Sequence, residues 1–208
     1  MSHVIVVVEG PSAAGKTTWS TDHGTGNVVR ETSGVEPPEG LSDEAFGQFW
    51  TDVNCRRWAQ AVAAEGKCGV AVCDTDPLKL HYDYCLARVG AVTWRRFEVA
   101  VNLALEAISA RRLGMADIVL VSIPDHETLE RQRNSDSTRN RRNFELHRRL
   151  GTSLRDWYAT FDRLDPGRVC WEYPQQIPAP VVRQRHDANF FRCWMAELPR
   201  PEAMPTGS

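Results

Sequence analysis

Short and almost wholly apolar runs recur along the chain, separated by longer segments in which apolar and polar residues mix. The first run, residues 3–9, is nearly all valine and ends at Gly10, a pattern typical of a parallel strand buried on both faces. Because helical segments lie between the runs, the pattern predicts a three-layer α/β/α sandwich with a mainly parallel five-stranded sheet. The other strands are predicted at residues 28–30, 69–73, 116–124 and 168–173.

The longest helical pattern covers residues 41–66. Ser42 is suited to cap its first turn, acidic residues follow in that turn, and Gly66 is expected just past its end. Its apolar positions recur at helical spacing, which predicts a core-facing stripe made of Phe46, Phe49, Trp50, Val53, Trp58 and Val62. Further helices are predicted at residues 15–23, 78–90, 93–114, 127–164 (broken at 134–138) and 189–198, and a loop at residues 34–40.

The length and composition of the chain indicate one globular unit. A chain of 208 residues is long enough for one well-buried domain, and 42% apolar with 25% charged residues is typical of globular proteins. We therefore expect a single domain at residues 1–198 and a disordered tail at residues 199–208. The formal net charge of -2 provides no general attraction for nucleic acid or anionic lipid, so any phosphate binding must be local.

No segment has the pattern of an exported or membrane-spanning chain. The early apolar run at residues 4–8 has neither a basic stretch before it nor a cleavage pattern after it. The six cysteines are scattered without a C-x-x-C pair, and the six histidines are scattered as well, which predicts reduced thiols and no metal cage. We expect a cytoplasmic protein.

Residues 10–17 read GPSAAGKT, which matches G-x-x-x-x-G-K-[ST] between a predicted strand and a predicted helix. Gly10 and Gly15 allow backbone angles that turn successive N–H groups toward phosphate oxygens, and the helix N-terminus adds positive charge. Lys16 can reach the β- and γ-phosphates, and the Thr17 hydroxyl can ligate Mg²⁺. The motif predicts a site for ATP and Mg²⁺, formed by Gly10, Ser12, Ala13, Ala14, Gly15, Lys16, Thr17 and Thr18.

Other signatures narrow the class of phosphate-loop protein. The chain has no N-K-x-D or D-x-x-G segment of a GTPase and no LSGGQ signature of an ABC-type ATPase. It resembles the P-loop nucleoside and nucleotide kinases, which include deoxynucleoside kinases, thymidylate kinase and nicotinamide riboside kinase. The resemblance covers residues 1 to about 175. It depends on the phosphate loop, "VVRE" at 28–31, "VCDTDP" at 72–77 and "LERQRNSDSTRNRRNFE" at 129–145, and implies a kinase fold with an arginine-rich lid.

In that family an acidic residue at a strand end beside the phosphate loop accepts the proton of the attacking hydroxyl. Glu31 and Asp74 both follow predicted strands. Hydroxyl attack on the γ-phosphate needs a carboxylate within hydrogen-bond reach and Mg²⁺ to neutralise the developing charge. We assign Glu31 as the general base and Asp74 as a ligand of Mg²⁺ or of the substrate hydroxyl, and the reverse assignment stays open. Asp76 is a weaker candidate, because an Asp-Pro pair also starts helices.

Eight arginines against two acids lie between residues 131 and 155. In the resembled family such a segment forms a lid over the phosphates, placed here at about residues 127–150, and guanidinium groups suit phosphate oxygens. The alternative is a basic surface for RNA or DNA, but Phe144 is the one aromatic residue in the segment, whereas single-strand binding favours interleaved aromatics. The expected phosphate contacts are Arg133, Arg139, Arg141 and Arg142.

The resemblance also implies where adenine and acceptor bind. Adenine would contact the loop after the last strand, residues 173–178, and the acceptor pocket would lie between Glu31, the helix at 41–66 and the segment after Asp76. The aromatic candidates to stack on a flat acceptor are Phe46, Trp50, Tyr82 and Tyr84. Deoxynucleoside kinases carry an E-R-S type motif where this chain has "DTD", which is more like nicotinamide riboside kinase, so the acceptor stays open.

The sequence therefore predicts an ATP-dependent kinase that phosphorylates a hydroxyl of a small nucleoside-like or other hydroxylated metabolite. A small molecule is favoured over nucleic acid as the acceptor, no membrane partner is expected, and a homodimer is one candidate assembly. Two alternatives stay open: a non-catalytic nucleotide-binding regulator and a polynucleotide 5′-hydroxyl kinase.

Overall fold

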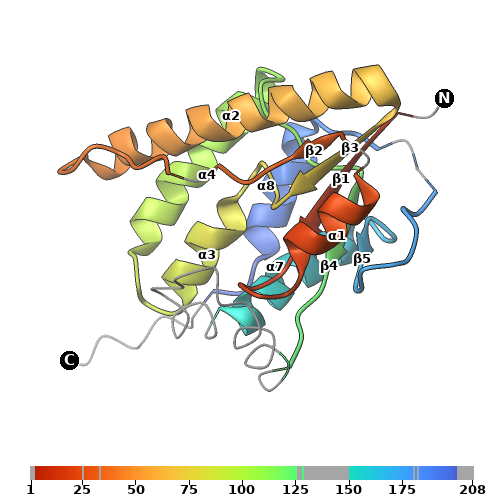
Figure 1. The fold of residues 1–208 in the computed structure, drawn as a ribbon. Coiled ribbons are helices and arrows are strands. Elements are labelled where there is room, and N and C mark those ends of the chain that lie inside the picture. The colour runs from red at the N-terminus through yellow and green to blue at the C-terminus, as the bar shows by residue number, and fades with distance from the viewer. Residues whose placement is uncertain are drawn as a thin grey trace, which may run out of the picture.

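The computed structural model describes residues 3–24, 26–32, 34–125, 128, 150–179, 181 and 183–200. Strands and helices alternate along these residues (Figure 1). The strands are β1 (Val4–Glu9), β2 (Val28–Val29), β3 (Val70–Asp74), β4 (Ile118–Val121) and β5 (Val169–Cys170). The helices are α1 (Lys16–His23), α2 (Asp43–Cys68), α3 (Leu80–Arg88), α4 (Trp94–Ser109), α7 (Gly151–Leu164) and α8 (Ala188–Glu197).

The strands form one sheet in the order β2-β3-β1-β4-β5, and each neighbouring pair is parallel. Val8 of β1 lies opposite Asp74 of β3, and Val29 of β2 lies opposite Cys73. Parallel strands end at the same edge of a sheet, so the phosphate loop and both candidate carboxylates emerge together. The five-stranded sheet is confirmed, and it is parallel throughout.

The two faces of the sheet are covered unequally. Side chains of β1 alternate between the faces: Ile5 and Val7 join the larger core, beneath α2, α3, α4, α7 and α8. On the other face Val4, Val6 and Val8 pack with Trp19 of α1. Figure 1 shows α1 in front of the strands and α8 behind them. Among the helices described, α1 alone covers the second face, so the phosphate loop enters the thinner layer.

The prediction for the end of the long helix was wrong. Ser42 caps α2 as expected, with its Oγ accepting a hydrogen bond from the N–H of Ala45 at 3.2 Å. The helix continues through Gly66 to Cys68, and Gly69 ends it in the left-handed conformation (φ 79°), with its N–H bonded to the carbonyl of Glu65. Glycine adopts that conformation without the steric cost of a Cβ, so Gly69 is the C-terminal cap.

The apolar stripe of α2 is only partly core. Val53 and Trp58 are buried, whereas Val62 is 43% exposed. Phe46, Phe49 and Trp50 are half-buried, because the N-terminal half of α2 extends past the sheet edge. The prediction of core packing was therefore wrong for these three aromatic residues and for Val62.

Other boundaries also differ. The helix predicted at 78–90 begins at Leu80, because Lys79 before it is left-handed (φ 48°). The helix predicted at 93–114 ends at Ser109, with Arg111 in the left-handed region (φ 59°). The last strand is shorter than predicted, because the chain leaves the sheet after Cys170 and turns toward α1.

Most of the predicted lid at residues 127–150 lies outside the described residues, as do Arg133, Arg139, Arg141 and Arg142. Residues 201–208 of the predicted tail lie outside them too. Within the described ranges, no helix combines the length and apolar character that crossing a membrane requires.

Candidate active site

The phosphate loop is shaped by glycines and by one strained alanine. A Cβ at Gly10 would lie 2.3 Å from the carbonyl oxygen of Ser122 and 2.9 Å from the Cβ of Ala14, so only glycine fits there. Gly15 precedes α1 with φ 86°, and no side chain caps that helix end. Ala13 is also left-handed (φ 76°), which is uncommon for a residue with a Cβ. An uncapped helix start beside left-handed residues is the backbone of an anion-binding loop.

Lys16 and Thr17 lie at the mouth of this loop. The Nζ of Lys16 donates to the carbonyl of Gly10 at 2.6 Å and to that of Pro11 at 3.0 Å. The Thr17 hydroxyl donates to Oδ2 of Asp74 at 2.8 Å. The fold therefore brings together two residues that are 57 positions apart in the sequence, and both were predicted as Mg²⁺ ligands.

The donor set at this point suits Mg²⁺. Hydroxyl and carboxylate oxygens are ligands that Mg²⁺ takes, and it usually binds through one or two protein oxygens together with phosphates and water. Among the residues described, no group of three or more His, Cys, Asp or Glu is arranged to hold a metal ion. The Thr17 hydroxyl and the Asp74 carboxylate thus provide two oxygens of the kind that Mg²⁺ takes from a protein.

Glu9, the last residue of β1, is a buried acid beneath the loop. It is 1% exposed, and its carboxylate accepts hydrogen bonds from the N–H of Gly10 at 3.1 Å and from that of Asp76 at 2.8 Å. Nε2 of His81 lies 3.5 Å from the same carboxylate, and burial lowers the pKa of that imidazole. Glu9 therefore joins the phosphate loop to the segment after β3.

Glu31 follows β2 and forms an ion pair with Lys79, the residue before α3. Its side chain is 46% exposed. Partial burial raises the pKa of this carboxyl, but the charge and hydrogen bond of Lys79, followed by the charges of Lys16 and Arg57, outweigh that effect, so its pKa lies below the usual value. Glu31 is consequently ionised at neutral pH and can accept a hydrogen bond from a hydroxyl group.

Asp76 lies deeper in the protein. It is 5% exposed, and burial raises the pKa of its carboxyl to about 7, with the charge of Glu9 acting in the same direction. Its Oδ1 accepts a hydrogen bond from the N–H of Leu78 at 2.9 Å, and the Tyr158 hydroxyl lies 3.4 Å from its Oδ2. Asp76 thus stabilises the turn before α3.

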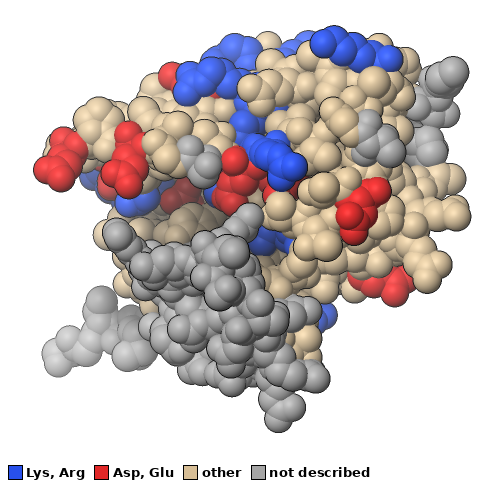
Figure 2. Space-filling model, viewed as in Figure 1, with Lys and Arg blue, Asp and Glu red and all other residues tan. Residues whose placement is uncertain are grey.

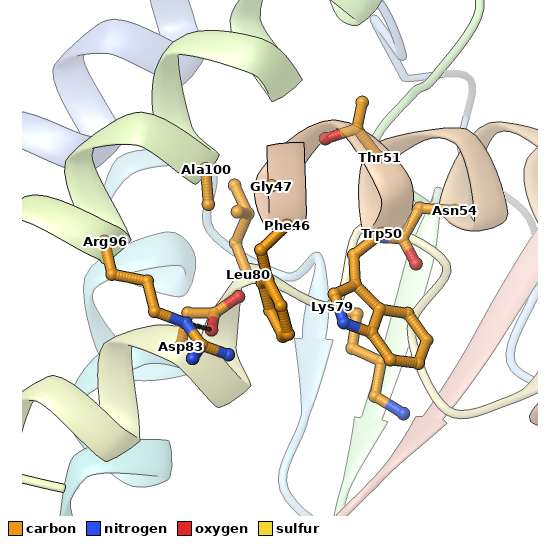
Figure 3. Close-up of a pocket in the computed structure, with 10 residues that line it drawn as sticks. All are labelled: Phe46, Gly47, Trp50, Thr51, Asn54, Lys79, Leu80, Asp83, Arg96 and Ala100. Atoms are coloured by element: carbon orange, nitrogen blue, oxygen red, sulfur yellow. Dashed lines mark ion pairs between the residues drawn. The ribbon is translucent and has the colours of Figure 1, made fainter. Parts of the chain in front are cut away.

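A recess that is open to solvent lies beside the same edge of the sheet, between α2, α3 and α4. Figure 3 shows Phe46 between Arg96 and Trp50. The guanidinium carbon of Arg96 lies 3.8 Å from the centre of the Phe46 ring, and the Phe46 and Trp50 ring centres are 6.2 Å apart. Oδ1 of Asp83 lies 3.6 Å from Nε of Arg96. The recess therefore combines flat apolar surfaces with a charged edge, and Lys79 is among its lining residues.

Two of the four predicted stacking residues line this recess, Phe46 and Trp50. The proposal for Tyr84 was wrong: it is fully buried, and its hydroxyl donates to the carbonyl of Pro199 at 2.8 Å. Tyr82 is half-buried and is not among the lining residues. The helix face on which each residue lies explains the outcome for Tyr84, because Tyr84 is on the face of α3 that packs into the core.

The loop after the last strand is held against α1. The Tyr173 hydroxyl donates to the carbonyl of Glu9 at 2.7 Å, and Nε1 of Trp19 donates to the carbonyl of Pro174 at 2.7 Å. Nε2 of His23 lies 3.0 Å from the carbonyl of Gln175. The segment predicted to contact adenine is therefore fixed beside the phosphate loop, and the adenine contact itself stays a prediction.

The sequence reasoning missed two buried residues of this region, Glu9 and Arg57. A signal exists for each. Glu9 is the one charged residue in the apolar run at 4–9, directly before the first glycine of the motif. Arg57 falls three residues after Asn54 and four before Ala61, which places it on the buried face of α2. In both cases the signal was a charged residue at a position where the surrounding pattern predicts an apolar one.

The order of the parallel strands and the phosphate loop after β1 give this chain the fold of the P-loop kinases. No family model and no curated protein matches the sequence. Solved structures do match, and nucleoside and nucleotide kinases are among them, as the sequence resemblance predicted.

Two of these structures illustrate the likeness. The deoxyadenosine kinase from M. mycoides with bound dATP superposes with a TM-score of 0.51 at 13% identity, over 80% of this chain and 90% of that one. The thymidylate kinase from Ehrlichia chaffeensis has a TM-score of 0.45 at 13% identity, over 94% of this chain and 98% of that one. The superposition on the deoxyadenosine kinase shows a shared fold, and an identity of 13% does not identify an acceptor.

Proposed function

We propose that this chain is a kinase that transfers the γ-phosphoryl group of ATP, with Mg²⁺, to a hydroxyl of a small nucleoside-like acceptor. The observation that carries the proposal is the contact between Thr17 and Asp74 at the same sheet edge as Glu31 and the recess. A phosphate loop by itself fits any enzyme that binds a nucleoside triphosphate. A recess lined by Lys79, whose partner is Glu31, supports transfer to a second molecule.

Each charged residue of the edge has a role in such a transfer. Lys16 would exchange its bonds to the carbonyls of Gly10 and Pro11 for bonds to phosphate oxygens. Bound Mg²⁺ supplies positive charge where negative charge develops on the phosphates. The acceptor hydroxyl oxygen forms a bond to the γ-phosphorus as the bond to the bridging oxygen breaks. ADP leaves, and the hydroxyl proton passes to a carboxylate.

We propose Glu31 as that carboxylate and Asp74 as the Mg²⁺ ligand. The engagement of Asp74 with the Thr17 hydroxyl supports a metal role. The contact of Glu31 with Lys79 supports a role toward the acceptor, because Lys79 lines the recess. The low pKa of Glu31 suits phosphoryl transfer, in which the base chiefly orients the hydroxyl in a loose transition state.

The recess supports a flat, polar acceptor. Phe46 and Trp50 offer aromatic surface, on which a heterocyclic base can stack. Arg96 and Asp83 offer hydrogen-bond donors and acceptors at its edge. Figure 2 shows acidic side chains next to basic ones around the hollow on this face. Charges of both signs favour a small molecule over a polynucleotide, whose binding depends on positive charge along the backbone path.

The remaining expectations are proposals of the same kind. A lid at about residues 127–150 would supply Arg133, Arg139 and Arg141 to the transferring phosphoryl group. Residues 1–198 would act as a single domain, and we keep the expected cytoplasmic location and the candidate homodimer as predictions.

The proposal is tested by measuring ADP release from Mg-ATP across nucleosides, nucleotides, other hydroxylated small molecules and 5′-hydroxyl oligonucleotides. We expect stimulation by one class of small molecule. Lys16→Ala should abolish the stimulation and keep the fold, because the Lys16 side chain bonds to carbonyls of its own loop. A flat panel with intact ATP binding would instead identify a nucleotide-binding regulator. Stimulation by oligonucleotides alone, falling steeply with salt, would identify a polynucleotide kinase.

A further inference from the structure

Arg57 is a buried cation bonded to backbone oxygens of two separate loops. It is 3% exposed. Its Nη2 donates to the carbonyls of Thr75 at 2.8 Å and Asp74 at 3.0 Å, and its Nη1 donates to that of Asp76 at 3.3 Å. Its Nε donates to the carbonyl of Arg30 at 3.4 Å. One side chain on α2 therefore connects the segment after β2 to the segment after β3.

Packing does not explain an arginine at this position. Buried arginines are normally paired with carboxylates, but within the described part of the chain none forms an ion pair with Arg57. An apolar side chain would fill the same space without the cost of removing a charge from water. Compared with an apolar side chain, the guanidinium group adds the four hydrogen bonds to backbone carbonyls.

The bonded carbonyls belong to the backbone that carries the candidate carboxylates. The carbonyl of Arg30 is part of the peptide group that leads into Glu31, and the other three carbonyls are those of Asp74 and of the two residues that follow it. β2 is only two residues long, and Glu31 lies beyond its end. The sheet therefore does little to fix Glu31, and Arg57 supplies a direct bond between the two segments.

The backbone at Thr75 gives independent support. Thr75 has φ 79°, and a β-branched residue in the left-handed region is a marked outlier. Such a conformation costs about 1–3 kcal/mol and persists where its surroundings enforce it. The shortest bond of Arg57 ends on the carbonyl of this residue. Arg57 is thus placed to hold the strained turn that orients Asp74 and Asp76.

We propose that Arg57 is a positioning residue that fixes the spacing between Glu31 and Asp74 through the backbone, without touching nucleotide or acceptor. The proposal rests on the kinase function proposed above for the catalytic consequence of that spacing. A group that is displaced by about 1 Å from its productive position lowers a rate by about 100-fold, so loss of the tether should lower turnover.

The test compares three variants of the full chain. Arg57→Lys keeps the charge and loses the planar fork, Arg57→Met loses both, and Arg56→Met is the control, because Arg56 is the exposed neighbour on the same helix. We expect kcat to fall by about 100-fold in Arg57→Lys and at least as far in Arg57→Met, with the KM for ATP within about threefold of wild type. Arg56→Met should match wild type.

The kcat of the lysine variant distinguishes a positioning role of Arg57 from a role in stability alone. If Arg57 matters only for folding, Arg57→Lys assayed well below its melting temperature would keep the wild-type kcat, and that result would overturn the proposal. If Arg57→Met does not fold, the lysine variant decides the question. An equal fall of kcat in Arg56→Met would also overturn it, because the effect would then not depend on the tether.

Hydrogen exchange of the nucleotide-free protein gives a readout that needs no activity. In Arg57→Lys, the amides of residues 30–32, 74–76 and 78 should exchange faster together, while amides of β1 and α4 stay unchanged. A uniform increase throughout the chain would indicate general destabilisation and overturn the tether. If the wild type has no kinase activity but Arg57→Lys still shows the local increase in exchange, the kinase function is refuted and the positioning role stands.

Discussion

The phosphate loop and the proposed acceptor side, which comprises Glu31, Lys79 and the recess, lie at one sheet edge but are built differently. In the loop, Lys16 bonds to carbonyls five and six residues away. On the acceptor side, Glu31 pairs with Lys79, which is 48 residues away, and the Arg96 guanidinium from α4 lies over the Phe46 ring from α2. A short motif encodes the first region, whereas the second forms only when distant segments meet.

This difference determines how much of each region's ligand can be inferred from the sequence. The loop needs particular residues at fixed spacing, so its ligand can be inferred from eight residues. The acceptor side needs only complementary groups that meet in space, and many sequences satisfy that condition. We therefore expect substitutions in the two regions to separate into different kinetic and energetic effects.

The largest expected effect separates the two candidate carboxylates. Glu31→Gln removes the carboxylate that we propose as the proton acceptor and should lower kcat by about 10²–10⁴-fold, with the affinity for Mg-ATP unchanged. Asp74→Asn weakens the contact with Thr17 and the ligand set for Mg²⁺, so it should raise the Mg²⁺ concentration that half-maximal activity requires. Steady-state kinetics at varied Mg²⁺, with calorimetric nucleotide binding, measure both.

The opposite pattern would exchange the two roles. If Asp74→Asn lost turnover at saturating Mg²⁺ and Glu31→Gln shifted the Mg²⁺ dependence, Asp74 would be the base. The proton acceptor would then lie beside the phosphate loop, and Glu31 would be a structural partner of Lys79.

A second prediction concerns pH and Asp76, which lies where the two regions join. Its pKa is raised from 3.8 to about 7, so the folded protein keeps this proton between about pH 4 and pH 7 while the unfolded chain loses it. The free energy of unfolding should therefore fall as pH rises through that window, by up to about 4 kcal/mol from this group.

Asp76→Asn removes this contribution. The amide oxygen can still accept the hydrogen bond from the N–H of Leu78, so the turn is preserved. Relative to wild type, the variant should become more stable with each step from pH 4 to pH 7, and the difference should level off above that. Urea unfolding at several pH values checks this, and a constant difference would show that Asp76 has an ordinary pKa.

The sequence predicted the fold and the loop well because both depend on local patterns. The valine run of β1, the motif at residues 10–17 and the Ser42 cap each act within a few residues. It could not show that Arg57 meets the carbonyls of residues 74–76, and it left Phe46 and Trp50 as candidates both for the core and for an acceptor pocket. Helical spacing assigns a residue to a face, but the partner of that face depends on the topology.

A third prediction tests the close packing of the loop. Gly10→Ala would place a Cβ 2.3 Å from the Ser122 carbonyl oxygen, which must shift, so the free energy of unfolding should fall by about 3 kcal/mol. Gly66→Ala is the matched control, because a Cβ there meets open space within a helix, and it should stabilise the protein by about 0.5–1 kcal/mol. Thermal and urea unfolding measure both. Equal effects at the two glycines would contradict the geometry of the loop.

The smallest expected effect concerns the acceptor alone. Trp50→Ala removes one flat wall of the recess and should raise the KM for the acceptor by about tenfold, the effect of about 1.4 kcal/mol of lost stacking, with the KM for ATP unchanged. Phe49→Ala is the control, because Phe49 packs edge-on against Trp50 without lining the recess. A rise in the KM for ATP in place of that for the acceptor would mean that the recess belongs to the nucleotide, and that both regions serve one ligand.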